Sequence, residues 1–470
     1  MVNYEIIDSF QTKGIVNQRV CFEVPLQYNN SKDSTTIKVA INITQKYDES
    51  LFQSGSAAAL DKIVLPQNPK LIVYLQGGPG YPCQVPTSNS GKEKVLLERG
   101  YQIVFLDQRG TGLSTPIEGD SFEELVRKRY NDDYSVENQL EYILNFRADS
   151  IVEDLEVIRK ELIPNQKWSL LGQSYGGFIT FAYLSKYSQS LKEVLITGGI
   201  PPIGFSVDEI YQATYERTKE RNVHYYNKFP QDKAKVAAIC QYLSTTRVIL
   251  PNEGILSVER FQQLGLIFGA TGGTDRLHEI VTKFYYDLQF GQPTYQILNT
   301  IQNELGFDTN VIYALFQEAI YCDGNIESPT NWGANRLRNI EGNEKFIKND
   351  HEVYFTGEMV YKSMFEDYSE LRKFKNLADR LHQNTKWSRL YDVEHLKTVD
   401  WNKVPVVAAT YFDDQYVDFG LSREAKKRAF NNNGNLKQYI TSEHFHNGLR
   451  ADPEKVLGAL FTLLDNGDLD

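Results

Sequence analysis

The chain has 470 residues, of which 41% are hydrophobic and 24% are charged, and its formal net charge is −11. This composition is typical of a globular protein, and the length suffices for two domains or for one domain with a large insertion. We expect no nucleic-acid partner, because an acidic chain without a basic stripe has little to offer a phosphate backbone.

The N-terminal segment MVNYEIIDSF lacks the basic and apolar parts of a secretory signal. No apolar run reaches the ~18 residues that cross a bilayer, so no membrane association is expected. The four cysteines, Cys21, Cys83, Cys240 and Cys322, are far apart and form no Cys-x-x-Cys pair. Free thiols in a reducing cytoplasm are the simplest interpretation, and we expect a cytoplasmic protein.

The first predicted elements are strands. RVCFEVPLQY (19–28) and TIKVAINITQKY (36–47) alternate in polarity around a turn-rich stretch, which predicts an antiparallel hairpin. Short apolar runs of the kind found in buried parallel strands follow: LIVYL (71–75), IVFL (103–106), WSLLG (168–172) and EVLIT (193–197). The intervening segment 149–162 places Ile151, Leu155, Ile158 and Leu162 on one helical face.

The strand pattern stops after this point for nearly 200 residues. From about Pro201 to Asp400 the sequence is mainly helical in period and rich in Tyr, Phe and charge. Strands resume at PVVAAT (405–410) and LKQYIT (436–441), and an amphipathic helix is predicted at 453–464. We predict an α/β protein with a mostly parallel sheet and a helical cap inserted after the sixth strand, divided into core 1–200, cap 201–400 and core 401–470.

A nucleophile motif lies between a strand and a helix. Gly172-Gln173-Ser174-Tyr175-Gly176 matches G-x-S-x-G, with WSLL before it and the apolar segment FITFAYL (178–184) after it. Such a turn lifts the serine hydroxyl clear of the sheet at a helix N-terminus, which stabilises negative charge. The sequence therefore predicts an α/β-hydrolase fold with Ser174 as nucleophile.

A glycine-rich loop, Gln76-Gly77-Gly78-Pro79-Gly80, follows the strand LIVYL. Its glycines allow backbone N–H groups to approach a substrate carbonyl, and the N–H of Tyr175 is the expected second donor. The loop DQRGTGLS (107–114) follows the next strand, and we expect it to brace the site without taking part in catalysis.

The fold requires an acid and then a histidine after the nucleophile. Only His444 and His446 of the seven histidines follow the resumed strands, and either could be the base. The acid is sought in YFDDQYVD (411–418), where Asp414 and Asp413 compete and Asp418 could instead cap the next helix. An H-x-H pair with no further ligand nearby predicts no metal site, and no cofactor is expected.

These motifs resemble those of the prolyl aminopeptidases (proline iminopeptidases), a peptidase family of the α/β-hydrolase fold. The resemblance covers roughly residues 36–470 and depends on seven segments: GGPG (77–80), DQRGTGLS (107–114), GQSYGG (172–177), EAIYC (318–322), FTGEM (355–359), YFDDQYVD (411–418) and HNGLR (446–450). It implies Asp414 as acid and His446 as base. The chain departs from many relatives at Gln76, where they have histidine.

The resemblance further implies release of N-terminal proline from peptides with a free N-terminus, through an acyl-enzyme. The N–H groups of Gly78 and Tyr175 would bind the oxyanion, and the cap residues Glu318 and Glu358 would hold the substrate amine. Two alternatives remain: an esterase or amidase of the same fold, and a non-catalytic ligand-binding protein. The sequence does not determine the oligomeric state or the strictness for proline.

Overall fold

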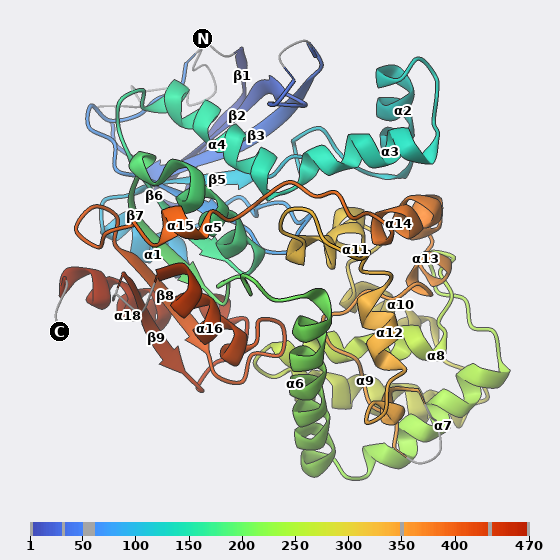
Figure 1. Ribbon diagram of the computed structural model, residues 1–470. Helices are drawn as coiled ribbons and strands as arrows, with labels where there is room; N and C mark the ends of the chain where they lie inside the picture. Colours follow the sequence, from blue (N-terminus) through green and yellow to red (C-terminus); the bar gives the residue numbers. More distant parts are fainter. Residues whose placement is uncertain (1–2, 31–32, 50–61, 348–351, 431–434, 468–470) are drawn as a thin grey trace.

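One nine-stranded sheet runs through the protein in the order β1-β2-β3-β5-β4-β6-β7-β8-β9 (Figure 1). The computed structural model describes residues 3–30, 33–49, 62–347, 352–430 and 435–467. The strands are β1 (Tyr4–Thr12), β2 (Ile15–Pro25), β3 (Thr36–Lys46), β4 (Leu71–Leu75), β5 (Gln102–Asp107), β6 (Trp168–Gln173), β7 (Leu191–Thr197), β8 (Val406–Tyr411) and β9 (Leu436–Thr441).

The sheet is antiparallel at its N-terminal edge and parallel elsewhere. β1, β2, β3 and β5 pair antiparallel in succession, and the five remaining pairs, from β4–β5 to β8–β9, are parallel. The predicted α/β fold with a mostly parallel sheet and an N-terminal hairpin is therefore confirmed. The expected strand count was too low by one, because the sequence analysis missed β1, so the helical insertion follows the seventh strand, β7.

Helices cover both faces of the sheet (Figure 1). On one face, Leu96 and Leu97 of α1 and Leu460 of α18 pack with Ile72 and Val407 of the strands. On the other face, α4 and α5 pack against each other, and α5 contacts β4, β6 and β7. The helices outside the insertion are α1 (Gly91–Glu98), α2 (Gly119–Arg129), α3 (Val136–Ile143), α4 (Ala148–Leu162), α5 (Tyr175–Tyr187), α16 (Phe419–Phe430), α17 (Gly448–Ala451) and α18 (Pro453–Asp465).

Most of the segment between β7 and β8 forms a group of helices beside the sheet, whereas its last helix, α15, packs against α5 and α16 (Figure 1). Its helices are α6 (Val207–Lys228), α7 (Asp232–Thr245), α8 (Val258–Gln262), α9 (Gly273–Leu288), α10 (Tyr295–Glu304), α11 (Val311–Phe316), α12 (Gly333–Arg338), α13 (Met364–Asp367), α14 (Lys375–His382) and α15 (Val393–Leu396). Among the described residues, no helix combines the length and the hydrophobicity needed to cross a bilayer.

Arg147 ties this insertion to the sheet-bearing part of the chain. Its guanidinium donates hydrogen bonds to the Ser388 hydroxyl (2.9 Å) and to the Ala319 carbonyl (3.1 Å), and it lies over the Trp387 ring at 4.8 Å. Because charged hydrogen bonds in a buried setting are stronger than neutral ones, Arg147 holds the loop after α11 at a defined distance from α4.

Arg109, in the loop after β5, is a buried structural anchor. Its side chain is 0% exposed and makes a bidentate ion pair with Asp154 of α4, at 2.7 and 2.5 Å. It also donates to the carbonyls of Leu26 and Asn145, and Asp154 accepts a further hydrogen bond from Tyr28 (2.7 Å). The loop 107–114 thus fastens β2, β5 and α4 together.

Replacing Asp154 by alanine should destabilise the protein by about 3–5 kcal/mol, because the Arg109 charge would remain buried without its partner. Urea unfolding followed by circular dichroism measures this change. Glu5→Ala is the matched control, since it removes an exposed ion pair with Lys38, and exposed ion pairs contribute little to stability. Similar losses in the two variants would contradict an anchoring role for the buried pair.

Candidate active site

Ser174 occupies the sharp turn between β6 and α5. Its φ of 56° and ψ of −124° lie in a region that residues other than glycine rarely adopt. The Ser174 N–H donates to the Thr197 carbonyl (2.9 Å), and the Gly177 N–H donates to the Ser174 carbonyl (2.7 Å). A Cβ at Gly176 would stand 2.0 Å from the Leu75 carbonyl oxygen, so only glycine permits this close approach to β4. The strained backbone therefore presents the Ser174 hydroxyl at the N-terminus of α5.

The glycine-rich loop after β4 lies against this turn. A Cβ at Gly77 would stand 2.8 Å from the Ser174 Cβ, so the loop and the nucleophile are in contact. The N–H groups of Gly78 and Tyr175 donate to no acceptor among the described residues. Two unpaired N–H groups beside a serine can donate hydrogen bonds to the negative oxygen of a tetrahedral intermediate.

Asp414 and His446 form a buried pair. His446 Nδ1 lies 2.7 Å from Asp414 Oδ2, and the two side chains are 8% and 1% exposed. The other carboxylate oxygen of Asp414 accepts the N–H groups of Tyr416 (2.8 Å) and Val417 (3.1 Å). The turn after β8 therefore fixes the carboxylate, and the carboxylate fixes the orientation of the imidazole.

His446 and Ser174 meet the same dipeptide at the end of β7. A Cβ at Gly198 would stand 3.3 Å from His446 Nδ1, and a Cβ at Gly199 would stand 2.3 Å from the Ser174 carbonyl oxygen. The Tyr416 ring covers the imidazole, with 4.7 Å between ring centroids. Burial lowers the pKa of His446, but the negative charge and hydrogen bond of Asp414, aided by Glu358, raise it above the ordinary value.

The other candidates for acid and base lie apart from this pair. Asp418 accepts the N–H of Leu421 (2.9 Å) at the start of α16 and is paired with Arg217 (2.9 Å), as a helix cap would be. Asp413 is partly exposed. His444 is buried, and its Nε2 atom has no hydrogen-bond partner among the described residues. The geometry thus favours Asp414 and His446 over their sequence neighbours.

Glu358 lies near the Asp414–His446 pair. Its carboxylate accepts a hydrogen bond from the Tyr313 hydroxyl (2.6 Å). Burial raises its pKa to about 7, although the charge of His446 and the bond from Tyr313 act in the opposite direction. A carboxyl group that titrates near neutrality, next to a histidine, is typical of functional sites.

Glu318 has a different environment. Its carboxylate is 2% exposed and lies 2.8 Å from His382 Nδ1. Burial raises the pKa of Glu318, but the His382 charge and hydrogen bond outweigh burial and hold it below the ordinary value. The Trp332 ring stacks on His382 with 3.6 Å between centroids. Glu318 is therefore paired within the insertion, whereas Glu358 interacts with the charges of His446 and Asp414.

Aromatic and amide side chains around Glu358 were not found from the sequence. Tyr81 packs edge-on against Tyr313 (5.2 Å between centroids), and Tyr416 covers His446. Gln317 is 1% exposed and lowers the pKa of Glu358 through its amide, yet neither of its polar atoms has a hydrogen-bond partner of normal geometry among the described residues. The one available signal was the position of Gln317 directly before the EAIYC segment.

This arrangement fits acyl transfer by a serine nucleophile. The Ser174 turn and the Asp414–His446 pair both adjoin Gly198-Gly199, two unpaired N–H groups belong to the Ser174 turn and the adjacent glycine loop, and the Glu358 carboxyl lies near the pair. Within the described residues, no group of three or more His, Cys, Asp or Glu side chains is placed to hold a metal ion.

Comparison with known proteins identifies the family. A family model described as the alpha/beta hydrolase fold matches residues 70–249. The chain is 39% identical to the proline iminopeptidase of Aeromonas sobria over 392 residues, which cover 83% of this chain and 87% of that protein. It is 33% identical to the proline iminopeptidase aneH of Aspergillus aculeatus over 471 residues, which cover 98% and 97% of the two chains. The chain therefore belongs to the proline iminopeptidase family of the α/β-hydrolase fold.

Proposed function

We propose that this protein is a serine exopeptidase that releases N-terminal proline from peptides. The observation that carries the proposal is the buried Asp414–His446 pair at the Ser174 turn with the Glu358 carboxyl beside it. The Aeromonas and Aspergillus relatives, named as proline iminopeptidases, support the same reaction.

In the proposed reaction, His446 takes the proton of the Ser174 hydroxyl, whose oxygen attacks the carbonyl carbon of the first residue. The N–H groups of Gly78 and Tyr175 stabilise the oxyanion. The C–N bond then breaks, and His446 gives its proton to the departing amine. Water, deprotonated by His446, then attacks the acyl-enzyme; the bond to the Ser174 oxygen breaks, His446 returns the proton to that oxygen, and proline is freed. Asp414 holds the imidazole in the productive tautomer.

An exopeptidase must stop after one residue. We assign this limit to residues 201–400, which would form a cap over the core segments 1–200 and 401–470. Glu358 is in this cap, and its carboxylate would pair with the cationic imino group of proline, so the substrate enters with its N-terminus foremost. Glu318 supports the proposal less directly, because His382 already holds its carboxylate.

The partners in this proposal are peptides with a free N-terminus. The four cysteines are unpaired thiols, which suits a reducing compartment, and we retain the cytoplasm as the proposed location. An esterase or amidase of the same fold remains the alternative, since the triad would serve either reaction.

One assay tests the proposal. Rates should be measured on a proline arylamide, its N-acetyl derivative and a short-chain ester, with the wild type and Ser174→Ala. The proposal expects rapid arylamide hydrolysis that acetylation and the Ser174 substitution both abolish. Ester hydrolysis without arylamide hydrolysis would favour the esterase, and no turnover of any substrate would favour a binding protein.

A further inference from the structure

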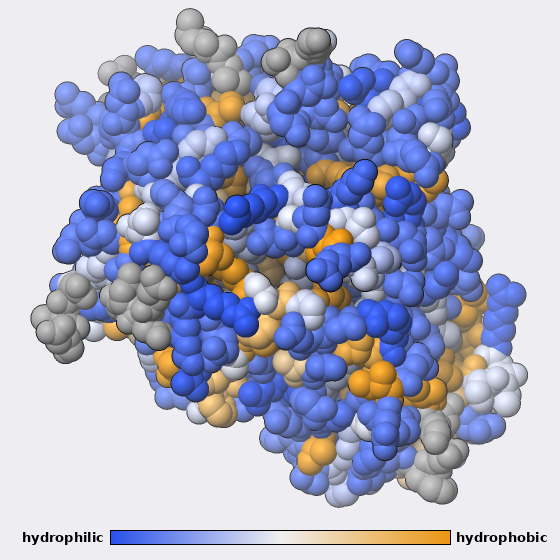
Figure 2. All heavy atoms as spheres, in the orientation of Figure 1, coloured by the Kyte–Doolittle hydropathy of each residue, from blue (hydrophilic) through white to orange (hydrophobic). Residues whose placement is uncertain are grey.

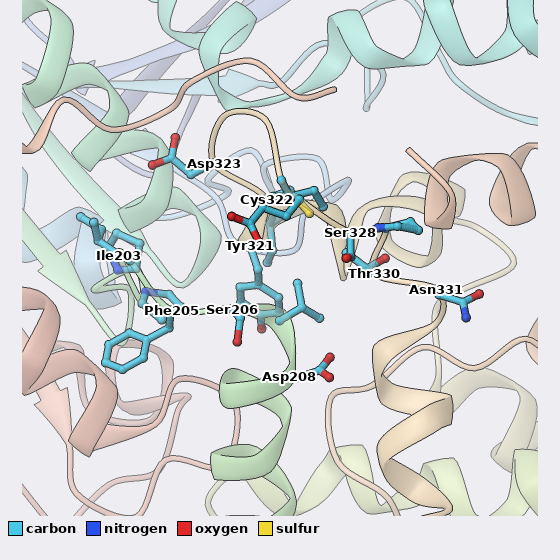
Figure 3. A pocket seen from close by; sticks show the side chains of 18 of the residues that line it. Ile203, Phe205, Ser206, Asp208, Tyr321, Cys322, Asp323, Ser328, Thr330 and Asn331 are labelled. Atoms are coloured by element: carbon cyan, nitrogen blue, oxygen red, sulfur yellow. The ribbon is translucent and has the colours of Figure 1, made fainter. Parts of the chain in front are cut away.

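A large open cleft lies next to the catalytic residues but contains none of them. Its volume is about 750 Å³, and its walls come from residues 201–208, 320–323 and 326–331, together with Arg336 and Tyr391. Figure 3 shows Ile203, Phe205 and Ser206 on one side and Ser328, Thr330 and Asn331 on the other, with Tyr321 and Cys322 between them. Hydrophobic residues are visible in a hollow at the middle of this face (Figure 2).

Two short stretches of chain join this cleft to the catalytic site. Pro201, in the cleft wall, is two residues beyond Gly199, which touches Ser174, and two residues span at most about 7 Å. Phe178 is one helical turn, about 6 Å, beyond Ser174. Its ring lies 6.2 Å from that of Tyr321, which lines the cleft.

Tyr321 therefore separates the cleft from the catalytic residues. Burial, and then the negative charges of Glu358 and Asp414, raise the pKa of Tyr321, so its hydroxyl is close to both carboxylates. On the catalytic side Ser174 and His446 are only 8% and 7% exposed. Because both residues are buried, a peptide cleaved at Ser174 needs an open region for the residues that follow the scissile bond, and this cleft is adjacent.

The lining of the cleft carries an excess of negative charge. Asp208, Asp323 and Glu327 face one described basic residue, Arg336, which is already paired with Asp208 through two hydrogen bonds. Asp323 accepts the N–H of Leu390 (2.6 Å). Glu327 is exposed and forms no ion pair with a described residue.

The cleft is large enough to hold part of a peptide. A volume of about 750 Å³ is in the range of ligand sites in proteins and accommodates a few peptide residues.

We propose that this cleft binds the residues that follow the scissile bond of a peptide substrate, and that Glu327 and Asp323 favour basic side chains there. This inference rests on the proposed function. The peptide leaves the catalytic space past Tyr321, and its amide groups meet the polar walls of the cleft.

The test compares Pro-Gly-Lys-Gly with Pro-Gly-Glu-Gly at low ionic strength. The wild type should show a kcat/KM up to about fivefold higher for the lysine peptide, since an exposed charge pair contributes at most about that factor. The preference should shrink in 0.5 M salt, where exposed charges are screened. Glu327→Lys should abolish or reverse it, whereas Glu98→Lys, an exposed residue of α1 outside the cleft, should retain it.

The outcomes separate the two proposals. Equal kcat/KM values for the two peptides in the wild type, with a proline arylamide still hydrolysed, would overturn this inference and leave the proposed function standing. The same effect of Glu327→Lys and Glu98→Lys would also overturn it, because charge in general, rather than the cleft, would then be responsible. No hydrolysis of any proline substrate would overturn both.

Discussion

Asp414→Asn is expected to lower kcat for a proline arylamide by about 10⁴-fold, the scale observed when the acid of such a triad loses its charge. The amide would keep the size of the side chain and could still accept the Tyr416 and Val417 N–H groups. The amide carries no negative charge, so it could not stabilise the imidazolium of His446. It could also hold the His446 imidazole in the wrong tautomer.

Asp413→Asn is the matched control, because it makes the same chemical change one residue earlier. Asp413 is partly exposed, whereas Asp414 is 1% exposed and 2.7 Å from the imidazole. Steady-state kinetics on purified variants, with circular dichroism as a check of folding, would compare them. A large loss for Asp413→Asn with little loss for Asp414→Asn would show that the acid is assigned to the wrong residue.

Glu358→Gln is expected to lower kcat/KM for the proline arylamide by about 30-fold or more, equivalent to about 2 kcal/mol for a lost buried charge partner. Hydrolysis of an ester without an amine should change far less, since Glu358 would contact only the substrate N-terminus. Glu318→Gln is the matched control: its carboxylate is paired with His382, so the variant should lose stability rather than selectivity. Equal losses on both substrates would exclude amine recognition by Glu358.

The pH dependence should distinguish the two roles. The pKa of Glu358 is raised to about 7 and that of His446 is also raised. Proline substrates need an ionised Glu358 and a neutral His446, so their kcat/KM should fall below pH 7 with two protonations. Hydrolysis of the ester needs only a neutral His446, so its kcat/KM should fall with a single protonation. In Glu358→Gln the ester profile should move to lower pH, because a negative charge that raises the His446 pKa is gone.

The same raised pKa predicts a stability effect. Above pH 7 the Glu358 carboxyl is ionised in both states, and its buried charge costs free energy in the folded state that it does not cost in the unfolded state. Near pH 4 this carboxyl is largely protonated in both states, so the cost disappears. Glu358→Gln should therefore equal the wild type near pH 4 and exceed it at pH 8, by at most about 3 kcal/mol. Unfolding midpoints in urea at the two pH values measure this difference, and a less stable variant at pH 8 would contradict the assigned burial.

Local sequence predicted the parts of this protein that depend on neighbouring residues. The runs 71–75 and 168–172 became β4 and β6 with at most one residue of change, because buried apolar runs have few alternatives to a central strand. The turn at Ser174 was recognisable because a strand that reverses into a helix requires glycine at Gly172 and Gly176. β1 was missed because many of its side chains are polar and an irregularity between Ile6 and Asp8 breaks its alternation.

Choices between nearby or similar residues depended on contacts across the fold. Asp413 and Asp414 are adjacent in one turn, and only the approach of His446, 32 residues later, distinguishes them. Glu318 and Glu358 are both acidic residues of the insertion, and only the packing of His382 against Glu318 leaves Glu358 as the carboxyl beside the catalytic pair. The sequence by itself determined the strands of the sheet from β2 onward, the turn at Ser174 and the order of the candidate residues. The tertiary structure alone decided which carboxylates meet the histidine, because burial and charge pairing arise between segments that the chain keeps far apart.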